Sequence, residues 1–208
     1  MADITFYTNP MSRGQIVRWM LEEVGQPYDT ELLDFASTMK DDAYRAVNPM
    51  MKVPAIVYRG QLVTEGAAII AYLADVFPDV GLGPRDEEKA DYYRWLFFAA
   101  GPIEQAVTNK AGGFEPTPER ARMFGYGSFD LAMNTLADHL ANHPFVCGDR
   151  FTAADVYVGS QVLWGTQFGT MPSLPSFLAY GERLSVREAY QRGKDIDGRL
   201  MAEMQAAG

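Results

Sequence analysis

The sequence predicts an α+β/α two-domain chain, with a small α+β domain at residues 1–78 and an all-helical domain at residues 86–208. Two observations carry this prediction. Runs of β-branched and aromatic residues, which are typical of strands, occur in the first eighty residues and are absent afterwards. The later residues instead repeat their apolar positions at helical spacing. Proline, aspartate and glycine gather between the two parts, which indicates a linker at residues 79–85.

The first domain opens with a strand and a helix. Residues 4–8, Ile-Thr-Phe-Tyr-Thr, are β-branched and aromatic and predict the strand. From Ser12 to Val24 the apolar residues recur on one helical face, and Ser12 with Gln15 forms a capping-box pattern. Gly25 follows directly and is expected to end this helix.

The remaining elements of this domain follow in short succession. We expect a strand at 28–33, a weaker helix at 38–48, a hairpin of 55–58 with 61–63, and a helix at 66–77. The order is therefore βαβαββα. A βαβ unit followed by a ββα unit is the thioredoxin-like pattern.

The second domain reads as helices throughout. The predicted helices cover 86–106, 118–142, 152–167, 176–184 and a segment after Arg187. The pair Gly101-Pro102 is expected to kink the first of them. Pro118 suits the first turn of the second.

Composition excludes several classes of function. The formal net charge is -9 and the basic residues are scattered, so neither nucleic acid nor an anionic membrane surface is an expected partner. No apolar run approaches the ~20 residues of a membrane span. The N-terminus lacks the pattern of a signal peptide, so we expect a cytoplasmic protein. The single cysteine, Cys147, excludes an intrachain disulfide.

Four local patterns occur in an order that resembles one known family. They are Tyr7 to Gly14 followed by Arg18-Trp19, Asn48 to Ala55, Thr64 to Ile69, and Phe151 to Asp155. Together they resemble the cytosolic glutathione transferases of bacterial type, without assigning a class. The resemblance implies a thioredoxin-like glutathione-binding domain, a helical domain, glutathione as co-substrate, and a homodimer with one active site per subunit.

The resemblance also implies how glutathione binds. The bond between Val53 and Pro54 is cis in the family, although trans is the commoner state of X-Pro bonds in general. The cis bond turns the backbone of Val53 so that the cysteinyl part of glutathione pairs with it as an added strand. Lys52 is expected to meet the glycyl carboxylate, unless it is an ordinary solvated lysine.

The γ-glutamyl end is expected at the turn Glu65-Gly66. A helix N-terminus offers free N–H groups to a carboxylate, and Glu65 offers a counter-charge to the ammonium. The family usually has serine where this chain has Gly66, so one hydroxyl contact is missing here. Arg13 is a secondary candidate for an anion contact, or a structural arginine at the helix start.

Three residues are candidates for activating the thiol. A free thiol has a pKa of ~8.5 and is mostly protonated at pH 7, and a hydroxyl donor with a helix N-terminus lowers that pKa. Ser12 ranks first, at the position of the catalytic cysteine of beta-class enzymes. Tyr7 ranks second and Asn9 third. The alternatives are a plain N-cap for Ser12 and a packed strand aromatic for Tyr7. Without a cysteine in this loop, disulfide chemistry is not expected.

The helical domain is expected to supply the electrophile site. The resemblance places a small hydrophobic electrophile near aromatic residues of this domain, and we take Phe98, Pro102 and Trp164 as candidates. Thr152 and Asp155 form an N-capping box with a folding role. Cys147 reads as a buried hydrophobe.

His139 and His143 stand one helical turn apart in the same domain. Two histidines without further ligands are weak evidence for a metal, so we expect a helix-end pair and no metal site.

The expected reaction is conjugation of the glutathione thiolate to small apolar electrophiles, which is a detoxification chemistry. Two alternatives remain open from the residues. One is glutathione-dependent peroxide reduction or isomerisation at the same site. The other is a non-catalytic binding or regulatory protein with this fold.

Overall fold

The computed structural model describes residues 2–207. Their packing forms two compact units. Unit 1 holds the residues up to Val80 together with those from Arg187 onward, and unit 2 is Gly81–Val186. No helix in the described part of the chain is long and apolar enough to cross a membrane.

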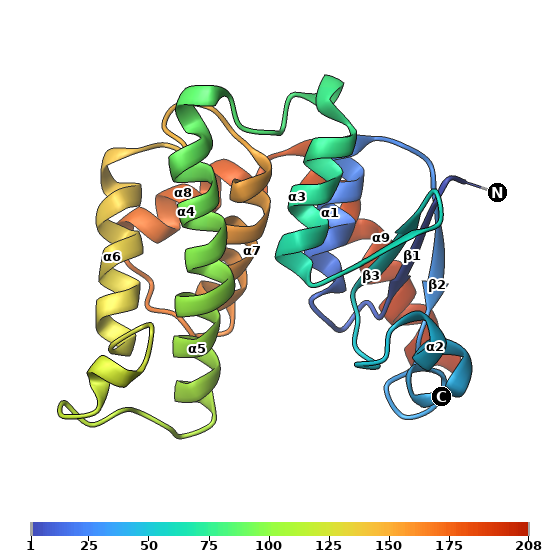
Figure 1. Cartoon of the computed structure of the whole chain (residues 1–208), viewed down its shortest axis with the longest axis horizontal. Coiled ribbons are helices and arrows are strands. Elements are labelled where there is room, and N and C mark those ends of the chain that lie inside the picture. Colours follow the sequence, from blue (N-terminus) through green and yellow to red (C-terminus); the bar gives the residue numbers. More distant parts are fainter. Residues whose placement is uncertain (1, 208) are drawn as a thin grey trace. The chain divides into compact units, whose positions relative to one another are not determined.

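Unit 1 is built on a four-stranded sheet with the order β2-β1-β3-β4. The strands are β1 (Ile4–Thr8), β2 (Tyr28–Leu32), β3 (Ala55–Tyr58) and β4 (Gln61–Thr64) (Figure 1). β1 runs parallel to β2 and antiparallel to β3, and β3 forms a hairpin with β4. The predicted thioredoxin-like fold is confirmed.

The two faces of this sheet carry different elements. Helices α1 (Gly14–Val24) and α3 (Gly66–Val76) pack against each other, and Phe6 of β1 is fully buried. Because side chains alternate along a strand, Tyr7 points to the opposite face. There it packs against a small cluster beside α2 (Asp42–Val47) and the 3₁₀ turn η1 (Thr38–Lys40). The predicted helix at 38–48 is therefore two shorter pieces.

The last helix, α9 (Glu188–Ala207), packs on α1 within unit 1. Arg187 forms two hydrogen bonds of 2.7 and 2.8 Å with the carboxylate of Glu23. The rings of Trp19 and Tyr190 meet edge to face at 4.9 Å. The segment after Arg187, predicted to belong to the helical domain, therefore belongs to unit 1.

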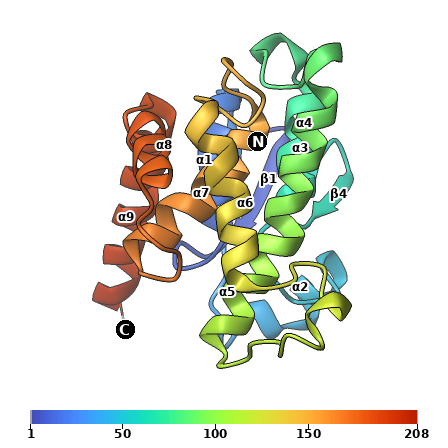
Figure 2. The same ribbon diagram turned by 90° about the vertical axis from the view of Figure 1, so that its left-hand side faces the viewer.

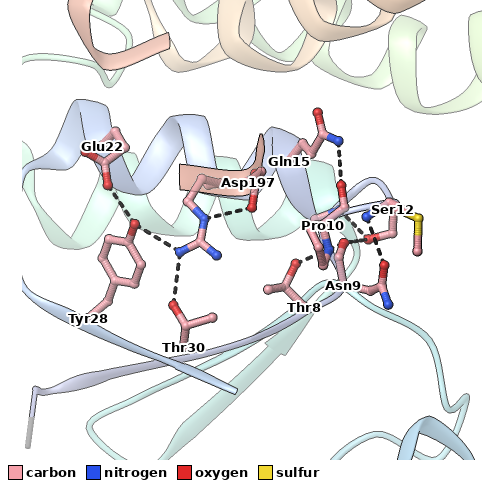
Figure 3. Close-up of polar contacts among 12 residues, drawn as sticks. Thr8, Asn9, Pro10, Ser12, Gln15, Glu22, Tyr28, Thr30 and Asp197 are labelled. Carbon is pink, nitrogen blue, oxygen red and sulfur yellow. Dashed lines mark hydrogen bonds and ion pairs between the residues drawn. The ribbon is translucent and has the colours of Figure 1, made fainter. Parts of the chain in front are cut away.

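A buried arginine ties α1 to its surroundings, and Figure 3 shows three of its partners, Tyr28, Thr30 and Asp197. Arg18 is 1% exposed, and its Nε lies 3.2 Å from Oδ1 of Asp197 on α9. Its Nη1 donates to the Tyr28 hydroxyl at 3.1 Å and to Thr30 Oγ1 at 3.0 Å, both on β2. A buried charge is tolerated only when it is paired and hydrogen-bonded. Arg18 therefore fixes α1 between the sheet and α9.

Unit 2 consists of helices in its described residues. They are α4 (Lys89–Phe98), a π-helical turn at Ala99–Ile103, α5 (Glu104–Ala111), α6 (Phe129–Asn142), α7 (Ala153–Gln167) and α8 (Pro175–Ser185), with short 3₁₀ turns at Asp86–Glu88 and Ala121–Met123. Within this unit α6 lies beside the α4–α5 segment (Figure 2). The first half of α7 is buried, and α7 packs against α4 and α8.

The structure corrects one sequence expectation in unit 2 and shows what the other one becomes. The helix predicted from Pro118 begins only at Phe129, because Gly127 takes a positive φ of 67° and Ser128 accepts the N–H of Leu131 at 3.1 Å as the N-cap. The breaker at Gly101-Pro102 produces a π-helical turn in a continuous helical segment. Proline has no N–H to donate, and a π turn accommodates that loss.

The start of α7 is organised by one buried carboxylate, and the predicted capping box is confirmed. Asp155 accepts the backbone N–H of Thr152 at 2.8 Å, the backbone N–H of Val146 at 2.8 Å and the Tyr180 hydroxyl at 2.8 Å. Burial raises the pKa of Asp155 to about 6 in spite of these donors. Its role is structural.

A second carboxylate holds the beginning of unit 2. The Arg150 guanidinium contacts both carboxylate oxygens of Glu88 and donates to the carbonyls of Gly81 and Gly83. Glu88 is 8% exposed. These hydrogen bonds lower the pKa of Glu88 from 4.5 to about 2.

The low pKa of Glu88 predicts an acid-sensitive contribution to stability. Because the folded chain binds this proton less readily than the unfolded chain, the stabilisation is complete above pH ~4.5 and is lost as the pH falls towards ~2. In urea unfolding, Glu88→Gln is expected to lower the free energy of unfolding at pH 7 and to flatten its decline between these pH values. Glu87→Gln, at an exposed neighbour, is the control. Equal pH slopes for both variants and the natural chain would contradict this role.

Candidate functional site

Sheet register brings the predicted glutathione-binding segments to one edge of unit 1. Tyr7 pairs with Ala55, and Ala55 pairs with Thr64, so β3 begins and β4 ends in one row, and β1 ends one residue beyond it. The segments directly beyond this row are the loop at 9–13, the residues 52–54 and the pair 65–66. The register therefore gathers candidate residues that are distant in the sequence.

Two helices also begin at this edge. α1 starts at Gly14 and α3 starts at Gly66. Helix N-termini present unpaired N–H groups and a partial positive charge, which suits anions. Glu65, directly before α3, is exposed and has a positive φ of 65°. A non-glycine residue in this region of backbone space is uncommon and is often found at functional sites.

Residues 52–54 present an open stretch of backbone. The bond between Val53 and Pro54 is cis, as expected. The N–H and C=O of Val53 have no hydrogen-bond partner among residues 2–207. The carbonyl of Lys52 accepts from the Tyr44 hydroxyl at 2.7 Å, while the Lys52 side chain is exposed. The segment is thus held from behind and free to pair with an extended peptide.

Ser12 lies half-buried in the loop before α1 (Figure 3). Its hydroxyl donates to the carbonyl of Asn9 at 2.6 Å and accepts the N–H of Gly14 at 2.9 Å. The capping box expected with Gln15 is absent, because the Gln15 amide donates to the carbonyl of Pro10 instead. Ser12 therefore sits at the positive end of α1 with a hydroxyl whose proton now points to a backbone carbonyl.

The other two thiol candidates have different surroundings. Asn9 is fully buried, and its amide is bonded to the carbonyl of Leu33 and to the N–H of Met11, both at 2.8 Å. Tyr7 is half-buried, and its ring lies 5.6 Å from that of Tyr44 on the sheet face opposite Thr8 and α1. Arg13, the remaining candidate of this loop, is exposed directly before α1.

The electrophile candidates lie in unit 2 and are partly exposed. Phe98 contacts Trp95 edge to face at 5.3 Å, Pro102 lies in the π-helical turn, and Trp164 is on α7. All three are half-buried. Sequence reasoning did not identify Gln161, whose amide donates to the Glu104 carboxylate at 3.1 Å.

The remaining chemically reactive side chains of unit 2 have structural surroundings. The rings of His139 and His143 stack at 4.3 Å, and one nitrogen of each is bonded to a backbone carbonyl. Within residues 2–207, no cluster of three metal-ligating side chains occurs. Burial raises the pKa of the Cys147 thiol to about 12, so this thiol is unreactive at neutral pH.

Comparison with known proteins agrees with this geometry. A family model described as "Glutathione S-transferase, N-terminal domain" matches residues 11–76. Glutathione S-transferase GstA of Escherichia coli O157:H7 is 29% identical over 185 residues, which are 86% of this chain and 90% of that protein. The chain belongs to the glutathione transferase family.

A solved structure and a second relative are similar to this glutathione transferase family member over most of its length. A theta-class glutathione S-transferase from Xanthomonas axonopodis pv. citri, solved with glutathione bound, has a TM-score of 0.73 and 27% identity, covering 93% of this chain and 97% of that one. A probable maleylacetoacetate isomerase of Caenorhabditis elegans is 27% identical, covering 73% of this chain and 80% of that protein. The similarity thus extends over most of each chain.

The start of α1 has no room for a Cβ at Gly14, whereas Gly198 in α9 has room for one. Alanine at these two positions is therefore expected to change the free energy of unfolding in opposite directions. A Cβ at Gly14 would lie 1.9 Å from Oγ1 of the buried Thr8. Gly14→Ala is therefore expected to lower the free energy of unfolding by about 1–3 kcal/mol, and adding Thr8→Ala should restore part of it. At Gly198 in α9 a Cβ meets nothing within 4 Å, so Gly198→Ala should raise stability by up to ~1 kcal/mol. Urea unfolding measures all three, and a neutral Gly14→Ala contradicts the close approach.

Proposed function

We propose that this protein transfers the glutathione thiolate to small apolar electrophiles. One observation carries the proposal. A single row of the sheet brings together two helix N-termini, the unpaired backbone of Val53 and the side chains of Lys52 and Glu65. Each of these features complements a different group of the tripeptide.

Each group of glutathione has its own proposed partner at this edge. The cysteinyl residue pairs with the backbone of Val53 beside Pro54, as an added strand. The γ-glutamyl carboxylate binds the N–H groups at Gly66, and Glu65 faces its ammonium. Lys52 pairs with the glycyl carboxylate, and Arg13 offers a secondary anion contact. The two carboxylates are thereby neutralised within a chain of net charge -9.

Ser12 is the proposed thiol donor. Its hydroxyl rotates from the Asn9 carbonyl to the sulfur and stabilises the thiolate, and the N-terminus of α1 adds a partial positive charge. Asn9 is fully buried and its amide is bonded to backbone groups on both sides. Tyr7 packs on the opposite face of the sheet, beside Tyr44. These surroundings favour Ser12 over the other two.

The rest of the proposal concerns the second substrate and the assembly. Phe98, Pro102 and Trp164, all in unit 2, supply an apolar wall for a small hydrophobic electrophile. The glutathione-binding domain is proposed to span 1–78, with the linker at 79–85. We further propose a cytoplasmic homodimer with a role in detoxification. No metal takes part in the proposed reaction.

A second candidate is glutathione-dependent isomerisation at the same site. The likeness to a probable maleylacetoacetate isomerase favours it over peroxide reduction. A substrate panel of an aryl halide, a cis-enoyl diketo acid and an organic peroxide, each with glutathione, separates the three reactions. Glutathione binding without turnover of any of them would support the non-catalytic alternative.

Removing the Ser12 hydroxyl tests the proposed donor. In aryl halide conjugation at pH 6.5, Ser12→Ala is expected to lower kcat/KM by about tenfold to a hundredfold, because the sulfur loses a hydrogen bond that favours its ionised form. The pH at which turnover rises should move upward by about one to two pH units.

Tyr7→Phe is the matched control for this test. It removes only the phenol oxygen of the second candidate, and near-natural turnover is expected. The opposite result, an inactive Tyr7→Phe beside an active Ser12→Ala, would mean that the Tyr7 hydroxyl, and not that of Ser12, donates to the sulfur.

A further inference from the structure

The sequence Asn-Pro-Met occurs twice, at residues 9–11 and 48–50, and both copies flank the proposed glutathione site. The two asparagines are 0% and 4% exposed. In each copy the side-chain oxygen accepts the N–H of the methionine two residues on, at 2.8 Å in the first and 3.1 Å in the second. This is an Asx turn, made with proline at its second position.

The amide nitrogen of each asparagine donates to the carbonyl of a neighbouring segment. Asn9 Nδ2 donates to the carbonyl of Leu33, just after β2, at 2.8 Å. Asn48 Nδ2 donates to the carbonyl of Lys52, just before β3, also at 2.8 Å. The two turns therefore make the same pair of side-chain hydrogen bonds, but each turn is bonded to a different segment of the site.

The first turn holds Ser12, the proposed thiol donor, through the backbone carbonyl of Asn9. The backbone carbonyl of Asn9 accepts both the N–H of Ser12 at 3.1 Å and its hydroxyl at 2.6 Å (Figure 3). The side chain of Asn9, bonded to Leu33 and Met11, restrains the loop that carries this carbonyl. The buried amide therefore sets the position from which the Ser12 hydroxyl reaches the sulfur.

The second turn holds the backbone of Lys52, next to the proposed peptide-binding residue Val53. Asn48 and the Tyr44 hydroxyl both bond to the carbonyl of Lys52, and the backbone carbonyl of Asn48 accepts the N–H of Met51 at 2.8 Å. These bonds fix the residue directly before Val53. No residue among their hydrogen-bond partners is shared between Asn9 and Asn48.

We propose that Asn9 and Asn48 are positioning residues with separate tasks, Asn9 governing ionisation of the bound thiol and Asn48 governing affinity for glutathione. This inference rests on the proposed function. Both side chains are buried behind their loops, so each acts through a neighbour: Asn9 through Ser12, and Asn48 through Lys52 and Val53. Sites without shared partners are expected to contribute independently.

A matched pair of substitutions tests this division, with glutathione as the probe. Titration calorimetry gives the dissociation constant, and the ultraviolet absorbance of the bound thiolate against pH gives its pKa. Asn9→Ala is expected to raise that pKa by about one unit, which lowers turnover at pH 6.5 about tenfold, while the dissociation constant stays within about twofold. Asn48→Ala is expected to weaken binding about tenfold and to leave the thiol pKa unchanged.

The possible outcomes separate the two claims. If the unmodified protein gives no heat with glutathione, both the proposed function and this inference are overturned. If it binds but both alanine variants change affinity and thiol pKa alike, the function stands and the division of tasks is overturned. Should an alanine variant fail to fold, Asn9→Asp and Asn48→Asp repeat the comparison. They keep the side-chain shape and the acceptor for the methionine N–H but lose the amide donor.

Discussion

The row of the sheet that joins Tyr7, Ala55 and Thr64 is the constraint on which the site depends. Backbone hydrogen bonding fixes where each strand stops, and a slip of one residue would turn every side chain to the other face. Because β1 and β4 end and β3 begins at the same edge, two helix N-termini and an unpaired peptide segment are brought there together. Helix N-termini carry a partial positive charge, so this edge suits the two carboxylates of the proposed tripeptide substrate although the chain has a net charge of -9.

Buried polar side chains turn this arrangement into a rigid one. Asn9 and Asn48 lock the loops at the edge, and Arg18 locks α1 to β2 and, through Asp197, to α9. A buried polar group left without its partner is costly, so each such contact strongly favours one geometry. The proposed chemistry requires this rigidity, because a thiolate is stabilised only by a donor held at hydrogen-bond distance.

Local sequence signals predicted much of unit 1. The strand positions, the left-handed stop at Gly25 and the cis bond before Pro54 are confirmed. The late start of α6 was missed, although Gly127 and Ser128 carried the signal. The place of α9 could not be predicted, because Asp197 meets a residue 179 positions earlier and no local pattern encodes that contact. The repeated Asn-Pro-Met was visible in the sequence, but the carbonyls that its amides reach were not.

The most direct test of the account is a structure of this protein with glutathione bound. The cysteinyl N–H and C=O are expected to pair with the backbone of Val53, with the sulfur within about 3.5 Å of the Ser12 hydroxyl oxygen. Glutathione bound away from this edge, or a sulfur that faces Tyr7 or solvent instead, would contradict it.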